Sequence, residues 1–156
     1  MGQYDNWKTG KAFRYGPGLG NVGSYQASGI PWITGSGTNG IAPGGQHHIK
    51  FPFVTRAFTV INLDDEGSTN QLRVHFHDKD SPQSPTVISG QHFVPLSGST
   101  SSFIFNVRVK EVFISNPIAT AGGFVVVAEL TNISTNEMFT LTGSGLTDGL
   151  NEGAAG

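Results

Sequence analysis

Glycine, proline and β-branched residues constrain this chain most, because they interrupt every stretch that could form a long helix. The chain has 22 glycines and 8 prolines among its 156 residues, and no window of about a dozen residues keeps an unbroken helical period. Short runs of alternating apolar and polar residues recur instead. In "QLRVHFH" (71–77), for example, Leu72, Val74 and Phe76 alternate with polar side chains, which is typical of a half-buried antiparallel strand.

Seven or eight such runs follow one another from His48 onward, separated by short turn sequences. The run 102–116 alternates up to an interruption at Glu111, where we predict a β-bulge. The run 124–133 is apolar on both faces, which predicts a central strand. The expected fold is therefore all-β, an antiparallel β-sandwich of jelly-roll or Ig-like type, with the strand order left open.

We expect three segments along the chain: an extended, glycine-rich N-terminal arm (1–45), the β-sandwich (46–146) and a C-terminal tail of small residues (147–156). The arm carries both tryptophans and all three tyrosines of the protein. A glycine-rich segment cannot bury a core of its own, whereas spaced rings suit a segment that lies on a surface. We predict that a neighbouring subunit orders the arm, and the alternative is a long loop packed on its own sandwich. The predicted interface anchors are Trp7, Phe13, Tyr15, Tyr25, Ile30 and Trp32.

Charge is scarce in this sequence. Only 13% of the residues are charged and the net charge is −2, against roughly 25% charged residues in typical soluble domains. The nine basic residues are scattered, which argues against nucleic acid as a partner. We find neither an apolar run of the roughly 20 residues that cross a membrane nor a secretory signal. We therefore expect the protein to be made in the cytosol and not to associate with membranes.

The segment "VHFHD" (74–78) is the main candidate for chemistry. His75 and His77 lie two residues apart on a predicted strand, and Asp78 follows them. This arrangement suits Zn²⁺ or Fe²⁺, with His92, His47 or His48 completing the ligand set. The same pattern also fits an ordinary polar strand face, which is the simpler interpretation.

Other catalytic patterns are weak. The chain has no Gly-x-Ser-x-Gly elbow, and the acidic turn 64–70 lacks the ligand spacing of an EF-hand. Its carboxylates, together with Asp78 and Asp80, are better interpreted as solvated loop residues than as a glycosidase pair. We expect no enzymatic activity and no cofactor. The aromatic residues of the arm, Trp7 and Trp32 above all, could stack on sugar rings, so a carbohydrate-binding module is the alternative function.

Three segments carry a resemblance to known proteins: "NVGSYQASGIPWITGSG" (21–37), "IKFPFVTRAFTVIN" (49–62) and "LRVHFHD" (72–78). They resemble small structural proteins of tailed phages and large DNA viruses, namely capsid decoration and minor capsid proteins. The resemblance implies a virion component, made in the host cytoplasm and present in many copies. It further implies contacts with a major capsid protein or with other copies of the chain, and no catalytic residues.

Overall fold

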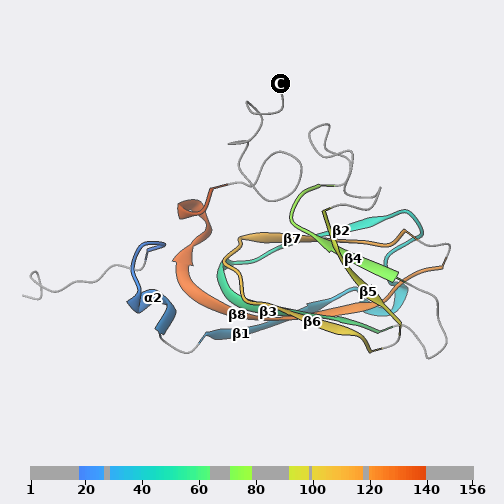
Figure 1. Cartoon of the computed structure of the whole chain (residues 1–156), viewed down its shortest axis with the longest axis horizontal. Coiled ribbons are helices and arrows are strands. Elements are labelled where there is room, and N and C mark those ends of the chain that lie inside the picture. Colours follow the sequence, from blue (N-terminus) through green and yellow to red (C-terminus); the bar gives the residue numbers. More distant parts are fainter. Residues whose placement is uncertain are drawn as a thin grey trace, which may run out of the picture.

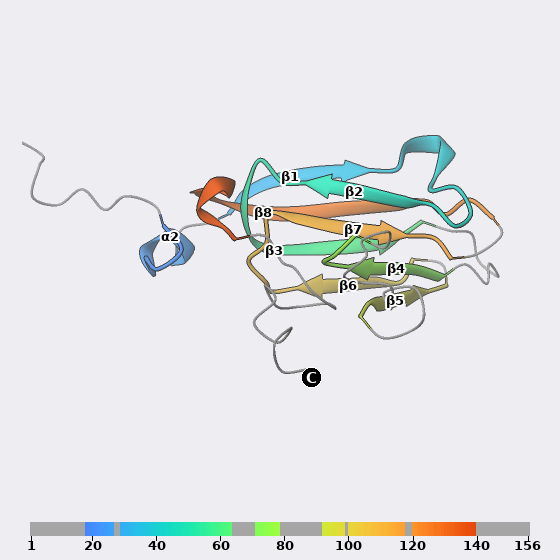
Figure 2. The same ribbon diagram turned by 90° about the horizontal axis from the view of Figure 1, so that it is seen from above.

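The computed structural model describes residues 18–26, 29–63, 71–78, 92–98, 100–117 and 120–139. These residues form two four-stranded antiparallel sheets (Figures 1 and 2), so the predicted all-β sandwich is confirmed. The first sheet consists of β1 (Ile30–Gly35), β8 (Phe124–Ser134), β3 (Phe53–Asn62) and β6 (Ser102–Phe105), in that order. The second sheet consists of β2 (Gln46–Lys50), β7 (Glu111–Ser115), β4 (Gln71–His75) and β5 (Val94–Ser97).

The strand pairing identifies the type of sandwich. The first strand pairs with the eighth, the second with the seventh, the third with the sixth and the fourth with the fifth, all antiparallel. The chain is therefore arranged like one long hairpin that has been folded over into two layers. This is the strand order of an eight-stranded jelly roll, and it decides between the two sandwich types that the sequence left open.

The core lies between the two sheets and takes apolar side chains from both of them. Phe58 sits at its centre, with its ring stacked on Phe105 at 4.7 Å between centroids and tilted against Phe51 at 5.6 Å. Trp32 packs edge-on against Phe51 at 5.3 Å. Aromatic contacts of this kind stabilise a fold by about 0.5–1.5 kcal/mol each beyond the area that they bury, so this cluster stabilises the inner side of the first sheet and packs Phe51, which follows β2, against it.

Residues 30–35 lie within the span that we predicted to be an arm, but in the structure they form the edge strand β1. This strand pairs with β8 along its whole length, from Ile30 opposite Leu130 to Gly35 opposite Val125. Its sequence, "IPWITG", contains a proline and ends in a glycine, and both residues weaken a strand pattern except at a sheet edge. The first strand of the sandwich therefore begins at residue 30 and not at residue 46.

The segment between β1 and β2 is also fixed to the sandwich. Ile41 is buried and exchanges two backbone hydrogen bonds with Gly122, at 2.7 and 3.0 Å. Gly40, with φ at +61°, precedes this bridge, and a side chain on it would meet the Gly122 backbone at 2.9 Å. Only glycine combines that backbone angle with so close an approach. Gly40 therefore serves tight packing in addition to turn formation.

The predicted long strand 102–116 is two strands in different sheets. Residues 106–110 cross from β6 in the first sheet to β7 in the second, so the predicted bulge at Glu111 is wrong. The Thr55 side chain holds the crossing, since its hydroxyl donates to the Val107 carbonyl at 2.9 Å and accepts from the Val109 amide at 3.0 Å. Val109 is buried, so the alternating pattern continues through the crossing although the ladder does not.

Helical structure in the described residues is limited to α2 (Gly23–Gln26) and the short 3₁₀ turns η1 (Gly37–Asn39) and η2 (Thr135–Glu137). Figures 1 and 2 show that α2 and η2 lie at the same end of the sandwich. None of the helices described has the length and apolar character needed to span a membrane.

Candidate interaction surface

One row of side chains, apolar on three strands and a threonine on the fourth, runs across the first sheet on the side that faces away from the core. Ile33 of β1 lies opposite Val127 of β8, Val127 opposite Thr59 of β3, and Thr59 opposite Ile104 of β6. Ile33 and Ile104 keep 68% and 61% of their surface exposed, and Val127 keeps 36%. We call these four residues the apolar row, and this side of the sheet the outer face.

The rows on either side complete the outer face. On one side, Gly35, Val125, Ile61 and Ser102 follow one another across the strands. On the other side, Pro31, Glu129 and Ala57 do the same. The inward neighbours of these residues, such as Phe58, Val60 and Val126, are fully buried, which fixes the outward direction of the side chains between them.

Valine and isoleucine are unusual on a solvated sheet face. An antiparallel sheet with one face in water normally alternates apolar and polar residues along each strand. β8 breaks this rule, because both its inward residues and its outward residues Val125 and Val127 are apolar. The prediction that 124–133 is a central strand is confirmed within the sheet, between β1 and β3. Burial within the chain explains the inner apolar residues of β8 but not the outer ones.

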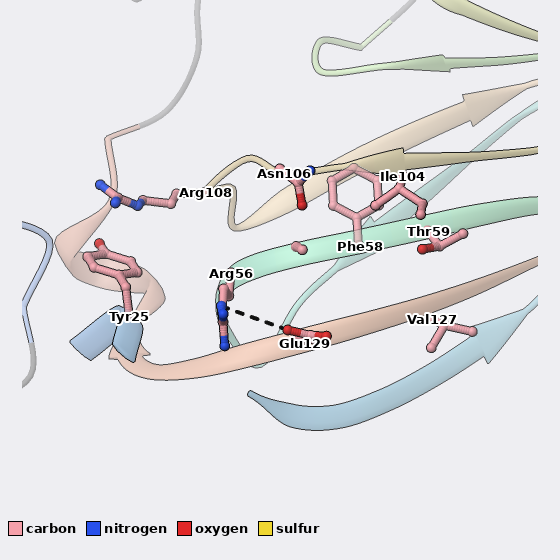
Figure 3. A pocket seen from close by; sticks show the side chains of 10 residues that line it. Tyr25, Arg56, Phe58, Thr59, Ile104, Asn106, Arg108, Val127 and Glu129 are labelled. Atoms are coloured by element: carbon pink, nitrogen blue, oxygen red, sulfur yellow. Dashed lines mark ion pairs between the residues drawn. The ribbon is translucent and has the colours of Figure 1, made fainter. Parts of the chain in front are cut away.

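A groove of about 550 Å³ opens over the outer face, and three residues of the apolar row, Thr59, Ile104 and Val127, help to line it (Figure 3). Its lining residues come from α2, β3, β6, β8 and the crossing segment: Tyr25, Arg56, Ala57, Phe58, Thr59, Ile104, Asn106, Arg108, Val127 and Glu129. At one end of the groove the Arg108 guanidinium stands 3.6 Å from the centre of the Tyr25 ring. The Tyr25 hydroxyl donates to the Leu19 carbonyl at 3.1 Å, so α2 and the crossing segment together form the wall at this end.

An ion pair between Arg56 and Glu129 lies on the outer face. Arg56 Nε lies 3.9 Å from Glu129 Oε2, and the two side chains are 44% and 57% exposed. Figure 3 shows this pair on neighbouring strands, between the Tyr25 wall and the apolar row. An exposed pair at this distance contributes at most about 1 kcal/mol to stability. The pair thus places one positive and one negative charge side by side on the outer face.

The outer side of the second sheet is different, because aromatic rings close it. His48, Phe113 and His75 stack across β2, β7 and β4, with centroid distances of 4.2 and 5.8 Å. His75 has no exposed surface, and Phe113 is also buried. Of the two outward sheet faces that the described strands form, the one on the first sheet is thus the more apolar and exposed.

The predicted metal residues lie near this ring stack. Both ring nitrogens of His75 have protein partners, with Nδ1 2.6 Å from the His77 carbonyl and Nε2 3.0 Å from the Ser115 hydroxyl. Asp78 Oδ1 accepts from the Gln46 amide at 2.9 Å. His77 is also buried, and its Nδ1 lies 3.2 Å from the Asp78 carbonyl.

Within the described part of the chain, no three His, Cys, Asp or Glu side chains gather closely enough to hold a metal ion. The other candidate histidines have different contacts. The ring of His47 meets Phe124 at 5.4 Å, and His48 Nε2 lies 2.7 Å from Glu111 Oε2. The structure thus gives His75 a structural role, as a polar bridge from β4 to β7 and to the chain that follows β4.

The predicted arm anchors are divided among three situations. Trp32 packs against the core of its own sandwich, which differs from the inter-subunit role predicted for it. Tyr25 forms the groove wall, and Ile30 is half-exposed at the sheet edge beside a cavity of about 120 Å³. Trp7, Phe13 and Tyr15 lie outside the described residues, as do the acidic turn 64–70 and Asp80.

Ile33, Val127 and Ile104 are not among the interface anchors predicted from the sequence. A signal for them was present, because β8 is apolar on both faces while only one side of its sheet faces the core. Comparisons of the chain with protein-family models, with curated protein sequences and with solved structures found no match.

Proposed function

We propose that this chain is a structural subunit of a virion shell, a capsid decoration or minor capsid protein, which works by packing against other protein chains. The observation that carries the proposal is the apolar row, because it crosses all four strands of a sheet face that stays exposed. Contiguous apolar patches on an otherwise soluble chain mark surfaces that bind proteins or ligands.

The size of the apolar row favours weak contacts that are repeated many times. Full burial of an exposed isoleucine contributes about 1.5–3 kcal/mol, so burial of Ile33, Ile104 and Val127 contributes several kcal/mol. Association itself costs roughly 4–15 kcal/mol. One such contact is therefore weak alone, whereas a shell that presents many identical sites multiplies it through avidity.

The assignment to a virion rests on the sequence resemblance of segments 21–37, 49–62 and 72–78. The jelly roll is compatible with it, since viral capsid domains use this fold, but lectin domains use it as well. A fold of this kind hosts many functions. The outer face and the ring-bearing residues before Gly18 are therefore the features that favour protein–protein contact over the alternatives.

Carbohydrate binding is the second candidate, and the groove beside Tyr25 is the observation that favours it. A volume of about 550 Å³ is in the range of small-molecule sites, and an aromatic ring with Asn106 and Arg56 nearby offers stacking and hydrogen bonds. The Tyr25 ring, however, is already covered by Arg108, and Trp32 packs on the core. Because a sugar would have to displace Arg108, the assembly role fits better.

The proposal is tested by sedimentation of the purified full chain over a range of concentrations, and by its co-sedimentation with assembled shells of a major capsid protein. We expect Ile33→Lys combined with Ile104→Lys to weaken these associations about tenfold or more, because each lysine would have to lose water on burial. Leu63→Lys is the matched control, since Leu63 is 51% exposed but lies outside the outer face rows.

Two results would overturn the proposal. One is a chain that stays monomeric at every concentration and does not co-sediment with shells. The other is binding on a glycan array that Tyr25→Ala abolishes while Ile33→Lys, at a residue outside the groove lining, leaves it intact, which would transfer the function to the groove.

A further inference from the structure

We propose that the partner on the outer face is a second copy of this chain, related by a two-fold axis that runs parallel to the strands between β8 and β3. This inference rests on the proposed function and names one partner for it. A two-fold contact uses the same patch on both subunits, so the patch must complement itself. The outer face meets this condition in its strand order, its apolar residues and its charges.

The strand order is the first step. The sheet reads β1-β8-β3-β6, and rotation about an axis between β8 and β3 lays this order over its reverse. β8 of one copy then faces β3 of the other, and β1 faces β6. An axis parallel to the strands keeps each cross-strand row at its own level, so every row meets itself.

The residues of each row are complementary under this rotation. In the apolar row, Ile33 faces the second copy's Ile104, and Val127 faces Thr59. In the next row, Val125 faces Ile61, and Gly35 faces Ser102. Val127 with Thr59 and Val125 with Ile61 thus meet over the central strands, while Ile33 with Ile104 and Gly35 with Ser102 meet over the edge strands.

The charges are complementary as well. Glu129 lies on β8, and Arg56 lies on β3 beside Ala57, the residue that is opposite Glu129 in the ladder. Under the rotation, Glu129 of each copy comes over Arg56 of the other. The exposed intramolecular pair is then exchanged for two intermolecular pairs, and no unbalanced charge from these residues is buried.

The patch has the size of a weak interface. With strands roughly 4.8 Å apart and about 6.8 Å between successive outward residues, three rows on four strands cover roughly 400 Å². A stable complex usually buries about 800 Å² on each partner. We therefore expect a dimer with a Kd in the micromolar range or weaker. The high local concentration of subunits in a shell would favour its formation.

Charge reversal tests the geometry directly. Glu129→Arg and Arg56→Glu are each made in the full chain, and each alone places like charges opposite one another twice. We expect each variant alone to self-associate at least tenfold more weakly than the original chain. An equimolar mixture has Arg opposite Glu at both positions, so we expect it to form a heterodimer about as tight as the original homodimer. Fluorescence-detected sedimentation with one variant labelled measures this.

The mixture is the decisive sample. If it associates no better than the single variants, the two-fold arrangement is wrong. The mixture could also fail to associate while the chain still co-sediments with shells and Ile104→Lys still weakens that binding. The proposed function would then stand, with a different partner on this face. If the mixture fails to associate and the chain does not co-sediment with shells, the dimer and the proposed function are both wrong. Circular dichroism and melting temperature serve as the folding control, because both side chains are exposed and their replacement should leave the fold intact.

Discussion

The guanidinium of Arg108 lies 3.6 Å above the centre of the Tyr25 ring, and this contact joins α2 to the segment that crosses between the two sheets. Arg108 is exposed and Tyr25 is half-buried. The contact therefore has one solvated partner, which limits its strength to about 0.5–1 kcal/mol. While the contact is made, the guanidinium covers one face of the Tyr25 ring, which would otherwise be open to the groove.

We predict that Arg108→Ala will release α2 locally and leave the sandwich intact. Amide hydrogen exchange in residues 18–26 should accelerate severalfold, while the free energy of unfolding should fall by no more than about 1 kcal/mol. Arg108→Lys should retain part of the protection. Equal exchange rates in the original chain and in Arg108→Ala would show that the contact does not hold α2.

Two glycines with similar φ angles but different surroundings allow a comparison. Gly40 has φ at +61° and a Cβ there would meet the Gly122 backbone at 2.9 Å, whereas Gly44 has φ at +68° and open space around it. Gly44→Ala should therefore cost only the conformational penalty of about 1 kcal/mol. Gly40→Ala adds the clash and a backbone conformation (φ +61°, ψ −171°) that is nearly restricted to glycine, and we expect it to cost at least roughly 2 kcal/mol more. Equal melting temperatures for the two variants would contradict the close approach.

The buried bridge at His75 gives a prediction that separates a structural role from metal binding. His75→Leu leaves the His77 carbonyl and the Ser115 hydroxyl without their ring partner, and we expect a loss of about 2–4 kcal/mol of stability. The loss should be the same with and without a chelator. His48→Gln, at a half-exposed ring, is the control and should cost less than about 1 kcal/mol. A chelator that alone destabilises the original chain would restore the metal hypothesis.

Truncations test where the sandwich begins. Deletion of residues 2–17 should leave the melting temperature within a few degrees, because β1 remains. Deletion of residues 2–40 removes β1 with Trp32 and exposes the edge of β8. It should cost at least roughly 3 kcal/mol and promote aggregation. A longer deletion that melts like the shorter one would show that the sandwich does not need its first strand.

The sequence predicted the fold class well, because the β signals are local. Alternation in segments such as 71–75 reports directly on the two faces of a strand. The crossing at 106–110 was missed for a physical reason, since Val109 is buried just as it would be in a continuous strand. Alternation does not record which sheet a residue belongs to. β1 was missed because proline and glycine depress a strand pattern that only its pairing with β8 restores.

The interaction surface was less accessible from sequence. Ile33, Val127 and Ile104 come from distant parts of the chain, and only the register of four strands places them in one row. The rings that stand out in the sequence proved a poor guide, because Trp32 serves the core. The histidines had the same difficulty, since spacing alone does not reveal that both nitrogens of His75 have partners.

The pairing of the first strand with the last has a consequence for how the protein comes into being. Ser36 and Phe124 are joined by a hydrogen bond although 88 positions separate them, and chains dominated by such distant pairings fold slowly. β1 emerges first from the ribosome but has no partner until β8 has been made. Its pairing with β8 must therefore wait until most of the chain has been translated, and during that interval Trp32 and Ile33 are exposed to chaperones.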